Sequence, residues 1–250
     1  MDNGGCEGAR CHLEWGRRGA ARAALRGDIL AVCDVLSFST AVVTACMGGA
    51  RVYPCFDDAD AQECAARFGA EIAVRREEVS STHRYSLSPV TFLQAKSDDA
   101  IALPSPNGAT CCRIGSVAPA VLIASLLNAT AAARAASLLM KRHHADLTVL
   151  ACGERQEPHE EGQLRFALED YLGAGALLAA LDMPCSPDAA VCRAAFLAVA
   201  GDLASLIREC PSGAELRDRG WPQDIEHAMQ RDICDVVPLL ADGWLATATF

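Results

Sequence analysis

The segment from residue 29 to residue 45, ILAVCDVLSFSTAVVTA, constrains the fold more than any other part of the sequence. Residues 29–33 form an apolar run that is typical of a buried strand. Asp34 stands where this strand ends, and the small residues 41–45 favour a helix soon afterwards. In an α/β sheet, a strand followed by a polar turn and a helix places polar groups at the carboxyl edge, where ligands bind. The segment therefore predicts an α/β fold with Asp34 at a candidate site.

The turn after this strand carries three hydroxyl side chains, Ser37, Ser39 and Thr40. The start of a helix offers free N–H groups and a positive dipole end, which favour an anion. We therefore expect these hydroxyls to line a substrate-binding site. The alternative is that Ser39 or Thr40 only caps the helix and that Asp34 only fixes the turn.

The order of strand, polar turn and helix recurs along the chain, which is the pattern of a largely parallel or mixed central sheet flanked by helices. The polar turns are expected to gather along one edge of this sheet. Asp242-Gly243 between two apolar runs predicts a C-terminal β-hairpin, one strand of which could join the sheet. Pro54 predicts an edge position for its strand. The expected strands are residues 29–33, 51–56, 70–74, 101–103, 119–124 and 147–152, and the expected helices include residues 59–68, 129–143, 165–181 and 186–210.

Length and charge restrict the class of protein. The chain has 250 residues and a net charge of −10, so we expect a single α/β domain, or two intertwined halves of about residues 28–145 and 146–250. The scattered Lys and Arg disfavour nucleic acid as a partner. No apolar run reaches the roughly 20 residues that span a bilayer, and the polar N-terminus does not resemble a signal peptide. We expect a cytoplasmic protein that binds a small anion and could form a homodimer.

The thirteen cysteines are spread through the sequence, mostly within apolar segments. There a cysteine acts as a small hydrophobic side chain. No two cysteines have the Cys-x-x-Cys spacing of common zinc sites. A cysteine-based redox or metal protein is therefore the least favoured of the three functional hypotheses for this sequence.

A second polar turn follows the short strand at residues 101–103. It contains Ser105, Asn107 and Gly108, and its Asn-Gly pair tolerates positive φ and lets the backbone approach a ligand closely. The turn is either a second anion-binding loop or an ordinary tight turn. Its place after a strand favours the first interpretation.

The polar residues of all the turns fall into two chemical sets. Hydroxyl, amide and guanidinium groups suit an oxyanion, and Arg165 could bind one in a bidentate way. Carboxylates suit Mg²⁺, which prefers one or two of them together with waters and substrate oxygens. Together the two sets predict metal-assisted phosphoryl chemistry. The carboxylates are Asp34, Glu154, Glu169, Asp170 and Asp224, and the predicted substrate-binding residues are Ser37, Ser39, Thr40, Ser105, Asn107, Gly108, Asn128 and Arg165.

Single carboxylates also have plainer explanations. Glu169 and Asp170 at a helix start could serve only as partners of the helix dipole. Because successive helical residues point about 100° apart, only one of these two is expected to face the site. Other phosphate-binding motifs are missing: the sequence contains no G-x-x-x-x-G-K-[ST] loop, and no G-x-G-x-x-G follows a strand.

An ordered set of short motifs runs across almost the whole chain. The motifs are Asp34-Val35-Leu36 with Ser39-Thr40, Ser105-Pro106-Asn107-Gly108, Asn128-Ala129, Gly153-Glu154, Glu169-Asp170 with Gly173-Ala174-Gly175, Ser212-Gly213 with Glu215-Leu216, Asp224, and Pro238. In this order they resemble the ComB family of 2-phosphosulfolactate phosphatases. The resemblance implies the α/β fold of that family and a Mg²⁺-dependent phosphatase that converts 2-phosphosulfolactate to 3-sulfolactate and phosphate on the way to coenzyme M.

The sequence departs from this family at one position. Members of the coenzyme M pathway carry Arg directly after Asp-Val-Leu, whereas Ser37 and Phe38 follow here, and Arg155 or Arg165 could supply the charge instead. The leading hypothesis is a phosphatase for a small phosphorylated hydroxy acid. The alternative is a catalytically weak relative that binds a small anionic metabolite. In the leading hypothesis the catalytic residues are Asp34, Glu154, Asp170 and Asp224, and the Mg²⁺ ligands are Asp34, Glu154 and Glu169.

Overall fold

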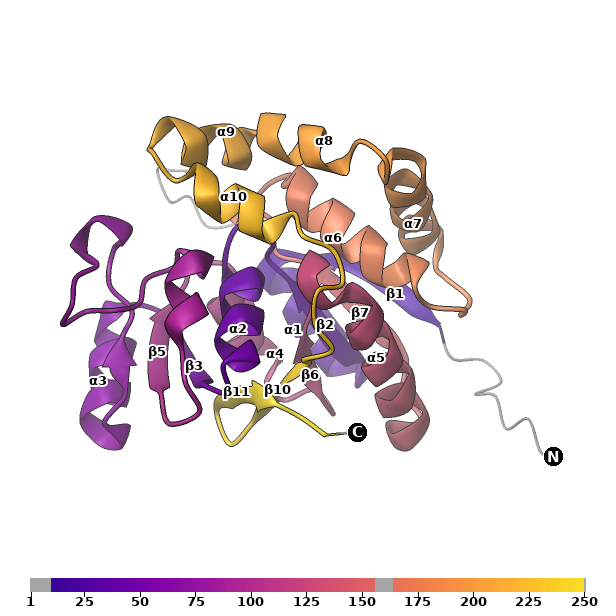
Figure 1. Cartoon of the computed structure of the whole chain (residues 1–250). Helices are drawn as coiled ribbons and strands as arrows, with labels where there is room; N and C mark the ends of the chain where they lie inside the picture. Colours follow the sequence, from indigo (N-terminus) through magenta and orange to yellow (C-terminus); the bar gives the residue numbers. More distant parts are fainter. Residues whose placement is uncertain (1–9, 156–163, 250) are drawn as a thin grey trace.

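A computed structural model describes residues 10–155 and 164–249 as a mixed β-sheet with helices on both faces (Figure 1). The strands in the central sheet are β1 (Cys11–Trp15), β2 (Ile29–Cys33), β3 (Arg51–Cys55), β4 (Glu71–Ile72), β5 (Ala100–Pro104), β6 (Val121–Ile123), β7 (Leu147–Ala151), β10 (Pro238–Ala241) and β11 (Trp244–Thr247). A separate two-stranded ribbon consists of β8 (Glu154–Arg155) and β9 (Leu164–Arg165).

The helices divide between the two faces of the sheet and a layer above it. The α-helices are α1 (Gly16–Arg26), α2 (Phe38–Met47), α3 (Asp58–Phe68), α4 (Gly108–Gly115), α5 (Ala129–His143), α6 (Leu168–Ala179), α7 (Pro187–Val199), α8 (Leu203–Glu209), α9 (Pro211–Asp218) and α10 (Pro222–Ala228). Three short 3₁₀ helices are η1 (Arg76–Glu78), η2 (Pro89–Gln94) and η3 (Leu126–Asn128).

The sheet has two parallel halves that run in opposite directions. Its strand order is β1-β7-β2-β6-β10-β11-β3-β5-β4. Strands β1, β7, β2 and β6 are parallel to one another, as are β3, β5 and β4, and the hairpin β10–β11 lies antiparallel between the two halves. The α/β fold, the mixed sheet and the C-terminal hairpin are confirmed. Both hairpin strands join the sheet, and they join it at its centre.

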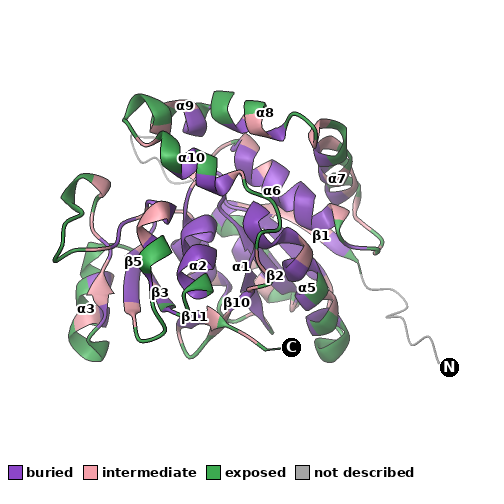
Figure 2. Ribbon diagram, in the orientation of Figure 1, coloured by how far each residue is buried: buried purple, intermediate pink, exposed green. Residues whose placement is uncertain are grey.

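Strand β2 is buried on both faces, as its continuous apolar sequence predicts. Leu30 and Val32 pack in the cluster that includes α1, α2 and α4, whereas Ile29, Ala31 and Cys33 pack in the cluster with α5, α6 and α7. Figure 2 shows this distribution: β2, α2 and α6 are largely buried, while the outer surfaces of α3, α8 and α9 are exposed. The carboxyl end of β2 is therefore held rigidly from both sides.

Helices α8, α9 and α10 form a layer that we call the helical cap, residues 203–228, along the top of Figure 1. Its apolar residues Ile207 and Ile225 pack with Val35, which directly follows Asp34, and with Leu172 of α6. The cap thus lies against the turn that follows β2.

Several expected elements differ from the structure. Strand β3 is interior although it contains Pro54, because its pairing with β11 is confined to Val52 and so needs no N–H from the proline. The predicted helix 186–210 is two helices, α7 and α8. Pro211 does not break a helix but starts α9, where its missing N–H is not needed. The predicted helix 165–181 begins only at Leu168, and Arg165 lies in β9.

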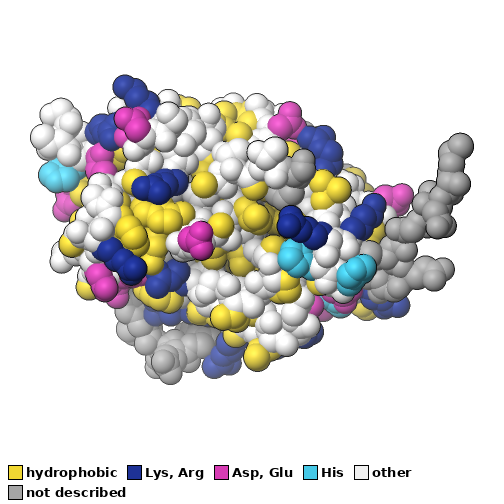
Figure 3. Space-filling view, turned by 90° about the horizontal axis from the view of Figure 1, so that it is seen from below, with side chains coloured by type: hydrophobic (Ala, Val, Ile, Leu, Met, Phe, Trp, Pro, Cys, Tyr) yellow, Lys and Arg dark blue, Asp and Glu magenta, His cyan; other side chains and the backbone are white. Residues whose placement is uncertain are grey.

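Within the described residues, no single helix has both the length and the apolar composition needed to cross a bilayer; α7 and α8 meet those criteria only as a pair bent by 106°. The face seen from below in Figure 3 carries separate Lys and Arg side chains among apolar and uncharged atoms, not one continuous basic tract.

Candidate active site

The side chain of Asp34 is buried at the carboxyl end of β2, with 6% of its surface exposed. Its Oδ1 accepts a hydrogen bond of 3.2 Å from the Phe38 N–H, and its Oδ2 accepts one of 2.9 Å from the Gly108 N–H. Phe38 begins α2 and Gly108 begins α4, so the carboxylate lies at two helix N-termini. The two turns that the sequence singled out are thereby joined by one side chain.

Gly108 is needed for this contact. A Cβ atom at this position would lie 2.3 Å from the Phe38 ring and 2.7 Å from Asp34 Oδ2. Only a residue without a side chain lets the backbone N–H approach the carboxylate here. The Asn-Gly pair therefore has a packing reason as well as the turn chemistry that predicted it.

The loop after β5 can meet Asp34 at the end of β2 because the sheet is twisted. Because β5 belongs to the half that runs against β2, the ends of these strands would lie at opposite edges of a flat sheet. Neighbouring strands rotate by about 20–25°, so the twist over the five steps from β2 to β5 reaches roughly 100–125°. The polar turns therefore do not gather along one edge of a parallel sheet, as the sequence predicted. The loop after β5 nevertheless reaches Asp34.

Glu154 and Asn107 extend the site beyond Asp34. Asn107 Nδ2 donates to Glu154 Oε1 over 3.1 Å, which links the loop after β5 to the loop after β7. Glu154 pairs with Arg165 across the ribbon β8–β9. Arg165 Nη2 donates to Ser212 Oγ at 3.3 Å, at the start of α9. Its Nη1 is buried and has no hydrogen-bond partner in ranges 10–155 and 164–249. A buried guanidinium N–H group without a partner has the chemistry to bind an anion.

Glu169 and Asp170 are both buried beside these groups, with 2% and 3% of their surfaces exposed. Asp170 accepts hydrogen bonds from the N–H groups of Val35 at 2.7 Å and Gly153 at 2.9 Å, so it ties the loop after β2 to the loop after β7. Glu169 Oε2 accepts from the Cys210 thiol at 3.2 Å. Both side chains are buried in the first turn of α6, with different partners: backbone N–H groups for Asp170 and a thiol for Glu169.

We call Asp34, Glu154, Glu169 and Asp170 the acidic cup. Burial, followed by the charge of Glu154, raises the pKa of Asp34 to about 7, although its two backbone hydrogen bonds act in the opposite direction. Burial also raises the pKa of Glu154, and burial and the charges of Asp34 and Glu169 raise the pKa of Asp170. Negative charge is thus concentrated in a place where water does not screen it.

The acidic cup is not a preformed three-ligand metal site. Across the part of the chain that the structure describes, no three His, Cys, Asp or Glu side chains have the spacing to hold one metal ion. Mg²⁺ does not require such a set, because it keeps several waters and binds through one or two carboxylates. The donor chemistry of Asp34 and Glu154 therefore fits Mg²⁺, whereas Glu169 is held by the Cys210 thiol.

Several predicted substrate-binding residues have their polar atoms occupied inside the protein. Ser39 Oγ donates to Val32 O and accepts from the Asp34 N–H, and Thr40 Oγ1 donates to Val35 O. These hydroxyls hold the turn around Asp34. They do not cap α2, because both residues lie inside the helix and its N-cap residue, Ser37, makes no side-chain capping bond.

Asn128 and Ser105 also shape the backbone and not a binding surface. The Asn128 amide accepts from the Ser125 N–H and donates to Ile123 O and Val236 O, and the residue has no exposed surface. Ser105 is buried, and its carbonyl accepts from the Thr110 hydroxyl. The Asn128 side chain completes a capping box with Ser125 at the start of η3, and its burial keeps it from a substrate.

Asp224 is fully buried in an ion pair. Its Oδ2 accepts from Arg76 Nε at 3.0 Å, and its Oδ1 accepts from Ser88 Oγ at 2.5 Å. An acid or base must reach the proton that it transfers. Asp224 has no exposed surface and holds an arginine instead, which argues against the predicted catalytic role.

Two arginines near the site were not predicted from the sequence. Arg17 is exposed, and its Nη2 donates to Pro106 O at 2.7 Å, beside Asn107. Arg76 donates from Nη2 to Ser37 Oγ at 2.9 Å. Arg17 lies just after β1, and its place at a strand end is a signal that could have found it; Arg76 lies in a stretch without a recognisable pattern.

The cysteines behave as the sequence predicts. Those in the described ranges are all free, and most are buried. Burial raises the pKa of Cys210 to about 12, with a further contribution from Glu169. Such thiols stay protonated at neutral pH, which makes them poor nucleophiles.

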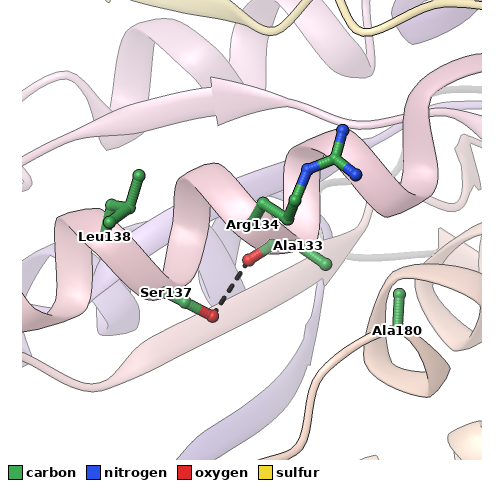
Figure 4. Close-up of a pocket in the computed structure, with 5 residues that line it drawn as sticks. All are labelled: Ala133, Arg134, Ser137, Leu138 and Ala180. Atoms are coloured by element: carbon green, nitrogen blue, oxygen red, sulfur yellow. Dashed lines mark hydrogen bonds between the residues drawn. The ribbon is translucent and has the colours of Figure 1, made fainter. Parts of the chain in front are cut away.

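A surface hollow elsewhere has no comparable chemistry. It lies between α5 and the end of α6, and Ala133, Arg134, Ser137, Leu138 and Ala180 line it (Figure 4). The Ser137 hydroxyl is satisfied by Ala133 O, and Arg134 forms an ion pair with Asp235. No residue of the acidic cup lines this hollow.

Comparison with known proteins agrees with the geometry. The profile of the 2-phosphosulpholactate phosphatase family matches residues 20–243, which include all of the site residues described above except Arg17. The chain belongs to the 2-phosphosulpholactate phosphatase family. A curated relative from Symbiobacterium thermophilum, named a probable 2-phosphosulfolactate phosphatase, is 27% identical over 233 residues, covering 88% of this chain and 94% of the relative. Membership in the 2-phosphosulpholactate phosphatase family identifies the protein as a phosphoric monoester hydrolase.

Proposed function

We propose that this protein is a Mg²⁺-dependent phosphatase that hydrolyses 2-phosphosulfolactate, or a closely related small phosphorylated hydroxy acid, to the hydroxy acid and phosphate. The family match supports the reaction class. The observation that carries the proposal is the pairing of the acidic cup with the unpartnered buried Nη1 of Arg165. One half suits a cation and the other an oxyanion, which is the arrangement that phosphate ester hydrolysis needs.

Asp34 and Glu154 are the residues that would hold Mg²⁺. Each would contribute an oxygen ligand. Burial is the main cause that raises the pKa of both, and a bound cation would offset this unfavourable burial of negative charge. Mg²⁺, when bound, would polarise the P–O bond and orient a water molecule. The buried ion pair of Asp224 and the backbone contacts of Asp170 assign these two carboxylates to positioning.

Arg165 would bind the oxygens of the transferred phosphate through Nη1, while Ser212 holds its Nη2. The Asn107 amide fixes Glu154, and the N–H groups of Phe38 and Gly108 fix Asp34. Burial of these groups excludes water and strengthens their interaction with the phosphoryl group.

A phosphate-release assay tests the proposal. Purified protein is incubated with 2-phosphosulfolactate, 2-phosphoglycerate, 3-phosphoglycerate and p-nitrophenyl phosphate, with Mg²⁺ or with EDTA. We expect release with Mg²⁺, loss of release with EDTA, and recovery when Mg²⁺ is added back. If EDTA leaves the rate unchanged, the Mg²⁺ dependence is wrong. If no ester is hydrolysed but anions raise the melting temperature, the protein is a binding relative without turnover.

A further inference from the structure

Arg76 reaches the turn that follows Asp34 from a remote part of the chain. It belongs to η1, in the irregular stretch between β4 and β5, and 16% of its side-chain surface is exposed. Its Nη2 donates to Ser37 Oγ at 2.9 Å, and Ser37 stands in the turn between Asp34 and α2. A guanidinium therefore lies at the place where Ser37 and Phe38 interrupt the motif that begins with Asp34.

The contacts of Arg76 fix its orientation but leave donors unused. Nε donates to Asp224 at 3.0 Å, and Nη2 donates to Ser37 and, at 3.5 Å, to Leu87 O. Ser88 donates to the other oxygen of Asp224 and so holds that carboxylate in place. No hydrogen bond from Nη1 to any described residue is present. Since a guanidinium has five N–H donors, the two on Nη1 remain for a ligand.

Two arginines thus contact residues next to the acidic cup or in it: Arg76 bonds to Ser37 in the turn after Asp34, and Arg165 pairs with Glu154 across the ribbon. The helical cap holds both. Arg165 is tied to Ser212 at the start of α9, and Arg76 is tied to Asp224 in α10. The two belong to different strands and loops, so they can bind two separate anionic groups. Ion pairs and hydrogen bonds that hold an arginine in one rotamer reduce the entropy lost on binding.

We propose that Arg76 is a specificity-determining residue that binds a second oxyanion of the substrate, a carboxylate or sulfonate that is not hydrolysed, and that Asp224 and Ser88 are its positioning residues. The proposal rests on the proposed function, since it assumes that Arg165 and the acidic cup take the phosphate. It explains why a buried carboxylate, Asp224, lies near the site without touching the reacting groups.

The test compares two substrates. For the Arg76→Gln variant we expect KM for 2-phosphosulfolactate to rise roughly tenfold or more, because a charge-assisted hydrogen bond is lost. KM for p-nitrophenyl phosphate, which has no second anion, should stay within about twofold of wild type. Arg76→Lys should recover part of the loss. Arg208→Gln, which removes a surface ion pair with Glu226 in the same cap, serves as the matched control.

Equal effects on the two substrates, or no effect on either, would overturn the proposal, because a purely structural residue does not distinguish them. If Arg76→Gln fails to fold with Asp224 left unpaired, Arg76→Lys keeps the positive charge, and the same comparison is made with it. The expected result is then a KM increase for 2-phosphosulfolactate alone.

A binding measurement separates this proposal from the proposed function. 3-Sulfolactate carries a carboxylate and a sulfonate but no phosphate, so it probes the Arg76 subsite without turnover. We expect it to raise the melting temperature of wild type but not of Arg76→Gln. If the wild-type protein hydrolyses no ester, this difference in stabilisation still supports the proposed binding role of Arg76. Equal stabilisation of both proteins, or stabilisation of neither, overturns it.

Discussion

Strand β2 has a buried aspartate beside each end, and the two have opposite surroundings. Asp28 precedes the strand and is 4% exposed; Asp34 follows it and is 6% exposed. Asp28 accepts hydrogen bonds from Arg26 Nε at 3.0 Å and from the Thr148 hydroxyl at 2.6 Å. Asp34 accepts only from two backbone N–H groups in the described structure, and it lies among three other carboxylates.

The difference separates a structural carboxylate from a functional one. The Arg26 guanidinium neutralises the charge of Asp28, so the carboxylate before β2 needs no further counter-ion. The charge at Asp34 is not neutralised by any described side chain in contact with it, and such a site is ready for a cation from solution. Burial alone does not distinguish the two aspartates; the partners do.

The largest expected effect comes from removing the charge at the functional end. Asp34→Asn should lower kcat/KM for phosphate release by roughly 10³-fold, because a metal ligand contributes several kcal/mol to the transition state. Circular dichroism should show an unchanged fold. Asp28→Asn is the matched control, and we expect it to retain kcat/KM within about threefold of wild type. An inactive Asp28 variant beside an active Asp34 variant would reverse the comparison.

The next effect concerns the backbone that holds Asp34. Gly108→Ala places a Cβ 2.3 Å from Phe38 and 2.7 Å from Asp34 Oδ2, so one of them must move. We expect a loss of about 1–3 kcal/mol in unfolding free energy and roughly a 10²-fold drop in kcat/KM from misplacement of the carboxylate. Urea denaturation and steady-state kinetics measure the two.

Gly201→Ala is the control for Gly108→Ala, because a Cβ at position 201 would meet nothing within 4 Å. It should leave both the unfolding free energy and the kinetics near wild type. A wild-type rate in Gly108→Ala would mean that the close approach to Asp34 has no catalytic importance.

A smaller effect is expected at the structural end. Asp28→Asn removes the charged acceptor of Arg26 and Thr148, and we expect about 1–3 kcal/mol of lost stability. Arg26 keeps its second ion pair with Glu14, which limits the loss. Thermal denaturation of wild type and variant at one pH measures it. A melting temperature equal to wild type would show that this ion pair contributes no net stability.

A further effect is a dependence of stability on pH. The folded state raises the pKa of Asp34 from 3.8 to about 7, so it holds the proton more tightly than the unfolded state. This stabilising contribution is fully present below about pH 4, decreases as the pH rises towards 7, and is lost above it. In EDTA, the melting temperature of Asp34→Asn relative to wild type should therefore rise between pH 4 and pH 8. A constant difference would mean that the Asp34 pKa is not raised.

Local sequence determined the elements that carry the site. The apolar run before Asp34 forms a strand because it can be buried on both faces. The Asp57 carboxylate caps the start of α3, and Gly69 ends it in the left-handed conformation that glycine adopts readily. Asp242-Gly243 forms the hairpin with positive φ at both residues. The ordered motifs predicted the family, and Asp34, Asn107, Gly108, Glu154 and Arg165 do lie together.

Tertiary structure decided the rest, because contacts between distant residues leave no periodic signal in the sequence. Which turn residues are free to bind a ligand depended on their partners inside the protein. Asn128 and Thr40 donate hydrogen bonds to nearby backbone carbonyls, and Asp224 forms an ion pair with Arg76. The central place of the hairpin followed from burying its apolar strands between two half-sheets. Sequence alone fixed which chemical groups stand at the ends of the strands. The twist of the sheet and the packing of the cap decided which of them meet.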